Sequence, residues 1–230
     1  VADAQTFRLI TGEPHPLGNL AVFRDASDVS VIERTVAPLR DLAAPSALLF
    51  VEGVSEAAAH DLASQGFEGV DPMPAMAVDV ALLAPTQAPE GYAFGRVFEG
   101  AEGTEYADVL ATGFGLPRGL ARLLSPEVQG ADPAPDAQVQ FFGIRREGKM
   151  VAASMLYLAD GLAGLYCITT LAEERGKGLG AHVTAETLRV AQRLGYGVGV
   201  LQSSAEGHSV YQSLGFRDVA SMPMFIRMPG

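Results

Sequence analysis

The sequence predicts a mixed α/β (α+β) protein, in which a sheet is flanked by helices. Three observations predict this fold class. Short apolar stretches alternate with stretches of helical periodicity along the C-terminal two thirds of the chain. The composition, 48% hydrophobic and 19% charged, is that of a chain with a buried core. Two prolines and a glycine within residues 84–91 break regular structure, so we expect a smaller lobe over 1–84, a linker over 85–91 and a larger domain over 92–230.

The larger domain is expected to contain strands and helices in a mixed order. Residues 139–145 and 150–158 predict a strand pair that turns at Arg146-Glu147-Gly148-Lys149. The remaining expected elements are strands at 92–98, 162–171, 198–201 and 222–228, and helices at 104–112, 117–124 and 207–214.

One further helix is expected after a glycine-rich turn. Val183, Thr187, Val190 and Leu194 recur at steps of four, three and four, which places them on one helical face. Gly195 follows the last of them, where a helix end favours the left-handed conformation. This segment predicts an amphipathic helix that packs on the sheet.

The two parts of the chain share a weak repeat. Gly66-Phe67 and Gly215-Phe216 lie 149 positions apart, and the same offset joins Met73-Pro74 to Met222-Pro223 and Ser55 to Ser204. Each copy follows an expected short strand and short helix, at 47–51 and 56–64 in the first. So few matches can arise by chance, and the alternative is a duplicated unit whose first copy has diverged.

Charge and cysteine content narrow the function classes. A formal charge of −11 argues against nucleic acid as a partner, because phosphate binding needs a clustered positive surface. The single cysteine, Cys167, excludes an intramolecular disulfide or a multi-cysteine metal site, and its apolar neighbours predict a core position. No metal site is expected. The chain shows no leader and no run of about 18 apolar residues, so we expect a soluble, cytoplasmic protein without a membrane partner. Oligomeric state cannot be inferred.

The strongest local signal is the turn Leu171-Ala172-Glu173-Glu174-Arg175-Gly176-Lys177-Gly178-Leu179-Gly180-Ala181, between an apolar strand and the amphipathic helix. Glycines let the backbone approach a ligand and present its N–H groups. The helix N-terminus adds a partial positive charge that favours an anion such as pyrophosphate. A local basic turn in so acidic a chain therefore indicates a phosphate site.

Other interpretations of this turn fit less well. A Walker loop requires a glycine where Leu171 stands and a Ser or Thr where Gly178 stands. A dinucleotide fingerprint requires an acidic residue at the end of the next strand, which instead ends in Gln202-Ser203-Ser204. A solvated turn without a ligand remains the plain alternative.

Arg175-x-x-Gly178-x-Gly180 resembles the acyl-CoA loop of the GCN5-related N-acetyltransferases (GNAT). Tyr211 followed by Gly215-Phe216 is similar to the closing motif of that family. The resemblance extends from Tyr92 to the C-terminus and is specific over 165–216. It implies an acyl-CoA N-acyltransferase fold for residues 92–230, preceded by a degenerate GNAT-like lobe.

The resemblance also implies an activity, transfer of an acetyl group from acetyl-CoA to a primary amine by direct attack within a ternary complex. Tyr211 would donate a proton to the leaving thiolate. Ser204 stands where the family often has a cofactor-binding asparagine, which leaves its role in doubt. Main-chain groups of Ile168 and Thr170 would hold the pantetheine arm between two splayed strands. The pyrophosphate would lie on the amides of Arg175, Gly176, Lys177, Gly178, Leu179, Gly180 and Ala181.

Several points stay open. Glu173 and Glu174 are expected to be solvated charges, and Glu99, Glu102 and Glu105 are candidates for the general base. The acceptor, a small-molecule or peptide amine, and the acyl chain length cannot be named. The alternative function is a non-catalytic acyl-CoA-binding module. The lobe over 1–84 carries Leu62 at the position equivalent to Tyr211 and no arginine–glycine loop, so it either has lost the chemistry or is unrelated.

Overall fold

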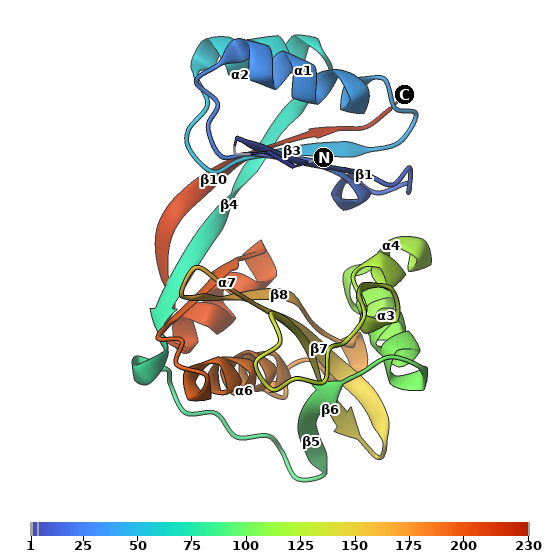
Figure 1. Ribbon diagram of the computed structural model, residues 1–230, viewed down its shortest axis with the longest axis vertical. Helices are drawn as coiled ribbons and strands as arrows, with labels where there is room; N and C mark the ends of the chain where they lie inside the picture. Colours follow the sequence, from blue (N-terminus) through green and yellow to red (C-terminus); the bar gives the residue numbers. More distant parts are fainter. Residues whose placement is uncertain (1, 4, 230) are drawn as a thin grey trace. The chain divides into compact units, whose positions relative to one another are not determined.

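The computed structural model describes residues 2, 3 and 5–229, which form two compact units (Figure 1). One unit comprises residues 1–74 and 220–230, and the other comprises residues 75–219. Strands β4 (Glu68–Asp79) and β10 (Arg217–Arg227) each begin in one unit and end in the other. This division differs from the expected lobe over 1–84, linker over 85–91 and domain over 92–230, which we keep as a proposal; the segment over 83–91 is irregular.

The unit over 75–219 is a mixed sheet in the order β4-β9-β8-β7-β6-β5. All pairs in this unit are antiparallel except β8 with β9. Its strands are β5 (Tyr92–Val97), β6 (Val139–Arg146), β7 (Lys149–Ala159), β8 (Leu162–Thr170) and β9 (Val198–Gln202), with the end of β4 at the edge. Its helices are α3 (Ala101–Phe114), α4 (Arg118–Leu123), α5 (Pro126–Gln129), α6 (Leu179–Arg193) and α7 (Ala205–Ser213). The elements expected from the sequence are therefore present.

Helices cover both faces of this sheet because strand residues alternate between two cores. On β6, Phe141 packs with Tyr106 and Leu110 of α3, while Phe142 packs with Leu188 of α6. Of the expected apolar face of α6, Val183 and Thr187 are buried, and Val190 and Leu194 are partly buried against the core that contains Leu188. The other buried residues of this helix are Leu179, Thr184, Ala185, Leu188 and Ala191. Gly195 ends this helix at φ +93°.

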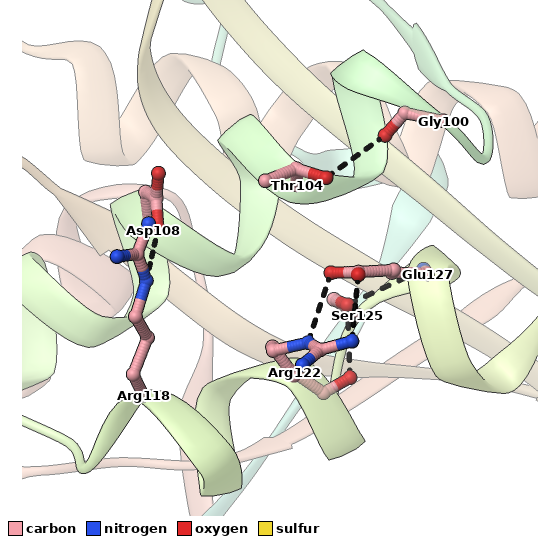
Figure 2. Close-up of polar contacts among 7 residues, drawn as sticks. All are labelled: Gly100, Thr104, Asp108, Arg118, Arg122, Ser125 and Glu127. Carbon is pink, nitrogen blue, oxygen red and sulfur yellow. Dashed lines mark hydrogen bonds and ion pairs between the residues drawn. The ribbon is translucent and has the colours of Figure 1, made fainter.

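Helices α3, α4 and α5 are tied together by charged side chains (Figure 2). Arg118 of α4 bonds Asp108 of α3 with its Nε 2.9 Å from Oδ1, and Arg122 pairs with Glu127 of α5 at 2.8 Å. Ser125 caps α5 by accepting a hydrogen bond from the amide of Glu127 at 3.3 Å. Exposed pairs of this kind contribute little each, so the apolar contacts of α3 fix these helices on the sheet.

The unit over 1–74 and 220–230 has a sheet in the order β1-β2-β3-β10, with the first half of β4 beside β10 and two helices on one face (Figure 1). Its core holds Phe23 stacked on Phe50 at 4.7 Å, with Phe225 edge-on to Phe50 at 5.7 Å. Its strands other than β4 are β1 (Thr6–Ile10), β2 (Asn19–Phe23), β3 (Ser46–Phe50) and the end of β10, and the helices are α1 (Val29–Arg40) and α2 (Glu56–Ser64).

The weak repeat corresponds to equivalent local structure in the two units. Helices α2 and α7 are both nine residues long, and their first residues lie at the 149-residue offset. Ser55 and Ser204 each cap their helix by accepting an amide hydrogen bond at 3.2 Å. Gly66 and Gly215 then turn the chain at φ +84° and +100°. This equivalence is compatible with a duplicated unit. Leu62 is fully buried, so the position equivalent to Tyr211 serves the core.

Candidate functional site

Strands β8 and β9 separate at the end where the glycine-rich turn begins. Their pairing runs from Leu162 with Val198 to Gly164 with Val200, yet β8 continues to Thr170. A bulge bends β8 in this stretch, because Cys167 and Ile168 together oppose one residue of β7. Cys167 has φ +53°, a costly conformation for a residue with a side chain. Main-chain groups of β8 beyond Gly164 can therefore bond a ligand inserted beside them.

The glycine-rich turn leads directly into the N-terminus of α6. Gly176 and Gly178 have φ +78° and +77°, and a Cβ at either would meet nothing within 4 Å. These glycines are therefore needed for backbone conformation rather than for space. In the described part of the chain no side chain caps α6. The free N–H groups and the helix dipole make this terminus an anion site.

Arg175 fastens the turn to its surroundings. Its Nε donates to the carbonyl of Thr170 at 3.2 Å, and its Nη2 donates to the carbonyl of Gly113, near the end of α3, at 3.0 Å. Gly113 itself lies against β8, since a Cβ there would fall 2.2 Å from Thr169 Oγ1. The side chain of Arg175 thus ties the turn to β8 and α3. Its acidic partner is Glu206, at 3.9 Å.

A cavity of about 920 Å³ joins the strand gap to the turn. It is lined by ten of the eleven predicted site residues: Ile168, Thr170, Arg175, Gly176, Gly178, Leu179, Gly180, Ala181, Ser204 and Tyr211. Phe114 also lines it and is exposed. Residues far apart in the sequence thus share one hollow.

Tyr211 lies in this cavity with 8% of its surface exposed. Its ring lies 5.8 Å from that of Phe216, and a Cβ at Gly207 would come within 2.9 Å of the ring. Burial raises the pKa of the Tyr211 hydroxyl to about 12, so the hydroxyl is neutral at physiological pH. It is available as a hydrogen-bond or proton donor.

Ser204 lines the cavity, but its hydroxyl is already engaged. The Oγ accepts from the amide of Gly207 at 3.2 Å and caps α7. Its hydrogen remains free to donate, so a cofactor contact from Ser204 stays a prediction.

Lys177 is the predicted site residue that does not line the cavity. Its Nζ lies 2.6 Å from Glu174 Oε2 and 3.2 Å from the Tyr92 hydroxyl, so only its main chain remains with the turn. The expectation that Glu174 is a solvated charge is wrong, because its carboxylate is enclosed by three donors and only 10% exposed. Hydrogen bonds from Lys177 and Tyr92 lower its pKa to about 2.

The three candidate base residues on or near α3 lie away from this cavity. Glu102 and Glu105 face Arg145 at 3.2 and 3.7 Å, and Glu105 also accepts from the amide of Met150 at 2.8 Å. Glu99 accepts from the amide of Ala131 at 3.1 Å. These carboxylates hold α3 and the following loop in place, and none lines the cavity.

Several lining residues were not expected from the sequence. Gly113 and Thr169 meet only because α3 crosses β8, so no local pattern marks them. Gly207 lines the cavity four residues before Tyr211 on α7, so a helical projection from Tyr211 would have found it, whereas Val210 and Ser213 are turned away from that face. The described residues contain no group of three or more potential metal ligands, nor a helix long and apolar enough to cross a membrane.

The parting of β8 and β9, the uncapped N-terminus of α6 and the buried Tyr211 thus belong to one cavity. The acetyltransferase (GNAT) family model matches residues 118–216, which contain the gap, the turn and Tyr211. These residues form a domain of that family, and its members are acyltransferases. The match covers less than half of the chain.

Solved structures share the fold over nearly the whole chain. A GCN5-related N-acetyltransferase from Kribbella flavida is 20% identical with a TM-score of 0.72, covering 100% of this chain and 89% of its own. One from Sphaerobacter thermophilus is 15% identical with a TM-score of 0.65, covering 92% and 73%. A tandem GNAT protein from the clavulanic acid biosynthesis pathway is 14% identical with a TM-score of 0.58, covering 92% and 75%. The expected GNAT-like fold is confirmed, and a tandem neighbour fits the N-terminal lobe. No curated protein matches the sequence.

Proposed function

We propose that this protein is an N-acetyltransferase that moves an acetyl group from acetyl-CoA to a primary amine of a small molecule or peptide. The observation that carries the proposal is one cavity holding an uncapped helix N-terminus, an opened strand edge and a neutral buried tyrosine. The helix N-terminus can bind a pyrophosphate, the opened strand edge can bond the amides of pantetheine, and the tyrosine can donate a proton to the leaving thiolate. No metal takes part in this scheme.

The chain's own groups fit acetyl-CoA at each point. Amides from Arg175 to Ala181 would hold the pyrophosphate, with the glycines allowing the positive φ values that aim them. Main-chain groups of Ile168 and Thr170 would bond the pantetheine arm, because β8 lacks its β9 partner there. Ser204 would contribute a hydroxyl at the α7 end of the cavity.

In the proposed reaction the neutral amine attacks the thioester carbonyl directly, the new C–N bond forms, and the C–S bond breaks with its electrons on sulfur. Tyr211 donates its proton to that thiolate. Desolvation in the cavity also makes a leaving thiolate more basic, which favours transfer of the proton from the neutral Tyr211.

The amine's own proton needs another acceptor. Glu174 has its pKa lowered to about 2 and its oxygens bonded, so it is a poor base. Glu99, Glu102, Glu105 and Glu173 lie outside the cavity, and Glu206, which lines it, faces Arg175 at 3.9 Å. We therefore propose that water in the cavity carries this proton to solvent.

The decisive experiment is calorimetric titration of acetyl-CoA into wild type, Gly178→Ala and Gly195→Ala. Both glycines have positive φ with open space around them, at opposite ends of α6, so alanine costs roughly 1–2 kcal/mol of strain at either. Only Gly178 lines the cavity. We expect Gly178→Ala alone to weaken binding at least tenfold. Equal affinity in all three proteins, or no binding to wild type, would contradict the proposal.

A non-catalytic acyl-CoA-binding module is the second candidate function. The observation in its favour is the lack of a free general base among the candidates. Each glutamate near the turn or on α3 that could act as a base is either hydrogen-bonded or outside the cavity. A free-thiol assay over a panel of amines distinguishes the two. Amine-dependent thiol release that Tyr211→Phe abolishes identifies a transferase, whereas tight acetyl-CoA binding without release identifies a binding module.

A further inference from the structure

A compact polar cluster adjoins the glycine-rich turn, and its central residue, Glu174, also lines the cavity. The cluster centres on the carboxylate of Glu174, the last residue of the 3-10 turn Ala172–Glu174. Glu174 Oε2 accepts from the Tyr92 hydroxyl at 2.5 Å and from Lys177 Nζ at 2.6 Å. Glu174 Oε1 accepts from Arg146 Nη1 at 3.2 Å.

The partners come from three separate parts of the unit. Tyr92 begins β5 at the sheet edge, Arg146 ends β6, and Lys177 lies between the two glycines of the turn. The partners also contact one another, since the Tyr92 hydroxyl accepts from both Arg146, at 3.3 Å, and Lys177. Both cations lie near the Tyr92 ring, at 5.5 and 5.9 Å from its centroid. The carboxylate thus joins the glycine-rich turn to the sheet.

We propose that Glu174 is a positioning residue for acyl-CoA, which holds the glycine-rich turn in its binding conformation through Lys177 and anchors it to Tyr92 and Arg146. This inference rests on the proposed function, because it assigns a role within the same site.

Two features separate positioning from plain stabilisation. The turn contains two residues with positive φ and open space around them, so local packing does not fix it. The ion pair also holds Lys177 away from the cavity, so the basic side chain acts on the loop's shape rather than on the ligand's phosphates. A loop ordered in advance binds more tightly because less entropy is lost on binding.

The test compares Glu174→Gln with Glu173→Gln, its neighbour in the same 3-10 turn, whose side chain is exposed. Hydrogen exchange of the amides of residues 175–181 is measured first, without ligand. Glu174→Gln is expected to speed this exchange about tenfold, and Glu173→Gln is expected to leave it unchanged. Acetyl-CoA titration should then show an affinity about tenfold weaker for Glu174→Gln, with kcat at saturating acetyl-CoA within twofold of wild type.

A double variant identifies the network as the cause. Tyr92→Phe removes one donor, and combined with Glu174→Gln it should weaken acetyl-CoA binding no more than Glu174→Gln alone. Unchanged exchange in Glu174→Gln, or tighter binding once Lys177 is released, would overturn the positioning role. Failure of wild type to bind acetyl-CoA while Glu174→Gln still loosens the turn would overturn the proposed function alone.

Discussion

The approach of α3 to β8 supports a stringent test of how the site is built. Gly113 lies where the last turn of α3 crosses Thr169, and its carbonyl accepts the hydrogen bond from Arg175. Substituting alanine at this position places a Cβ 2.2 Å from Thr169 Oγ1, 3.0 Å from its Cγ2 and 3.1 Å from its Cβ. Thr169 is only 7% exposed and β-branched, so it has little freedom to move aside.

Two opposing effects set the size of the change. Alanine is favoured over glycine inside a helix by about 1 kcal/mol. Overpacking against a buried side chain costs about 1–3 kcal/mol, and a 2.2 Å approach belongs at the upper end of that range. We therefore expect Gly113→Ala to lower the free energy of unfolding by about 1–2 kcal/mol, or the Tm by roughly 2–8 °C.

The assay is urea unfolding followed by circular dichroism, with Gly95→Ala as the control. Gly95 lies in β5, and a Cβ there meets nothing within 4 Å. A second variant, Gly113→Ala/Thr169→Ala, removes the two closest clashing atoms. It should recover part of the stability lost in Gly113→Ala, which makes the two substitutions non-additive.

The functional consequence follows from the same contact. Displacing α3 moves the Gly113 carbonyl away from Arg175, so acetyl-CoA affinity should also fall. If Gly113→Ala proves as stable as wild type or more so, helix propensity outweighs the clash, and the close packing of α3 on β8 described above is refuted.

Two other predictions concern ionisable groups. Tyr211→Phe should lower kcat about 100-fold while leaving acetyl-CoA affinity unchanged. The control is Tyr196→Phe, because Tyr196 is a partly buried tyrosine outside the cavity. A kcat of Tyr211→Phe within threefold of wild type would refute the proton-donor role. The pKa of Glu174 is lowered from 4.5 to about 2 by its bonds to Lys177, Tyr92 and Arg146, so its ionised form stabilises the fold above pH 4.5, and that contribution is lost as the pH falls toward 2. The urea midpoint of wild type should therefore drop more over this range than that of Glu174→Gln, and parallel curves would contradict the assignment.

The sequence predicted the elements of the larger unit because their signals are local. Periodicity placed α6, and the motif from Arg175 to Gly180 located the turn before it. The spacing of Tyr211 and Gly215-Phe216 marked α7 and the following turn, which the structure confirms. Helix ends and glycine turns depend on neighbours within a few residues, so a single sequence suffices to place them.

The directions of charged side chains could not be predicted in the same way. Lys177 stands in a motif that suggests phosphate contact, but its ammonium is held by Glu174 and by Tyr92 of β5 instead. Glu174 was expected to be solvated, but side chains of β5 and β6 enclose it. Ion pairing depends on which residues the sheet brings together, and that order is not written in local spacing.

The sequence by itself therefore determined the chemistry-bearing segments: a glycine-rich turn before a helix, a strand leading into it, and a tyrosine downstream. The tertiary structure alone decided that β8 parts from β9 after Gly164 and that α3 closes on Thr169. The physical reason is that turns and helix starts follow from neighbouring residues, whereas a gap between strands follows from a bulge and from packing between elements distant in the chain.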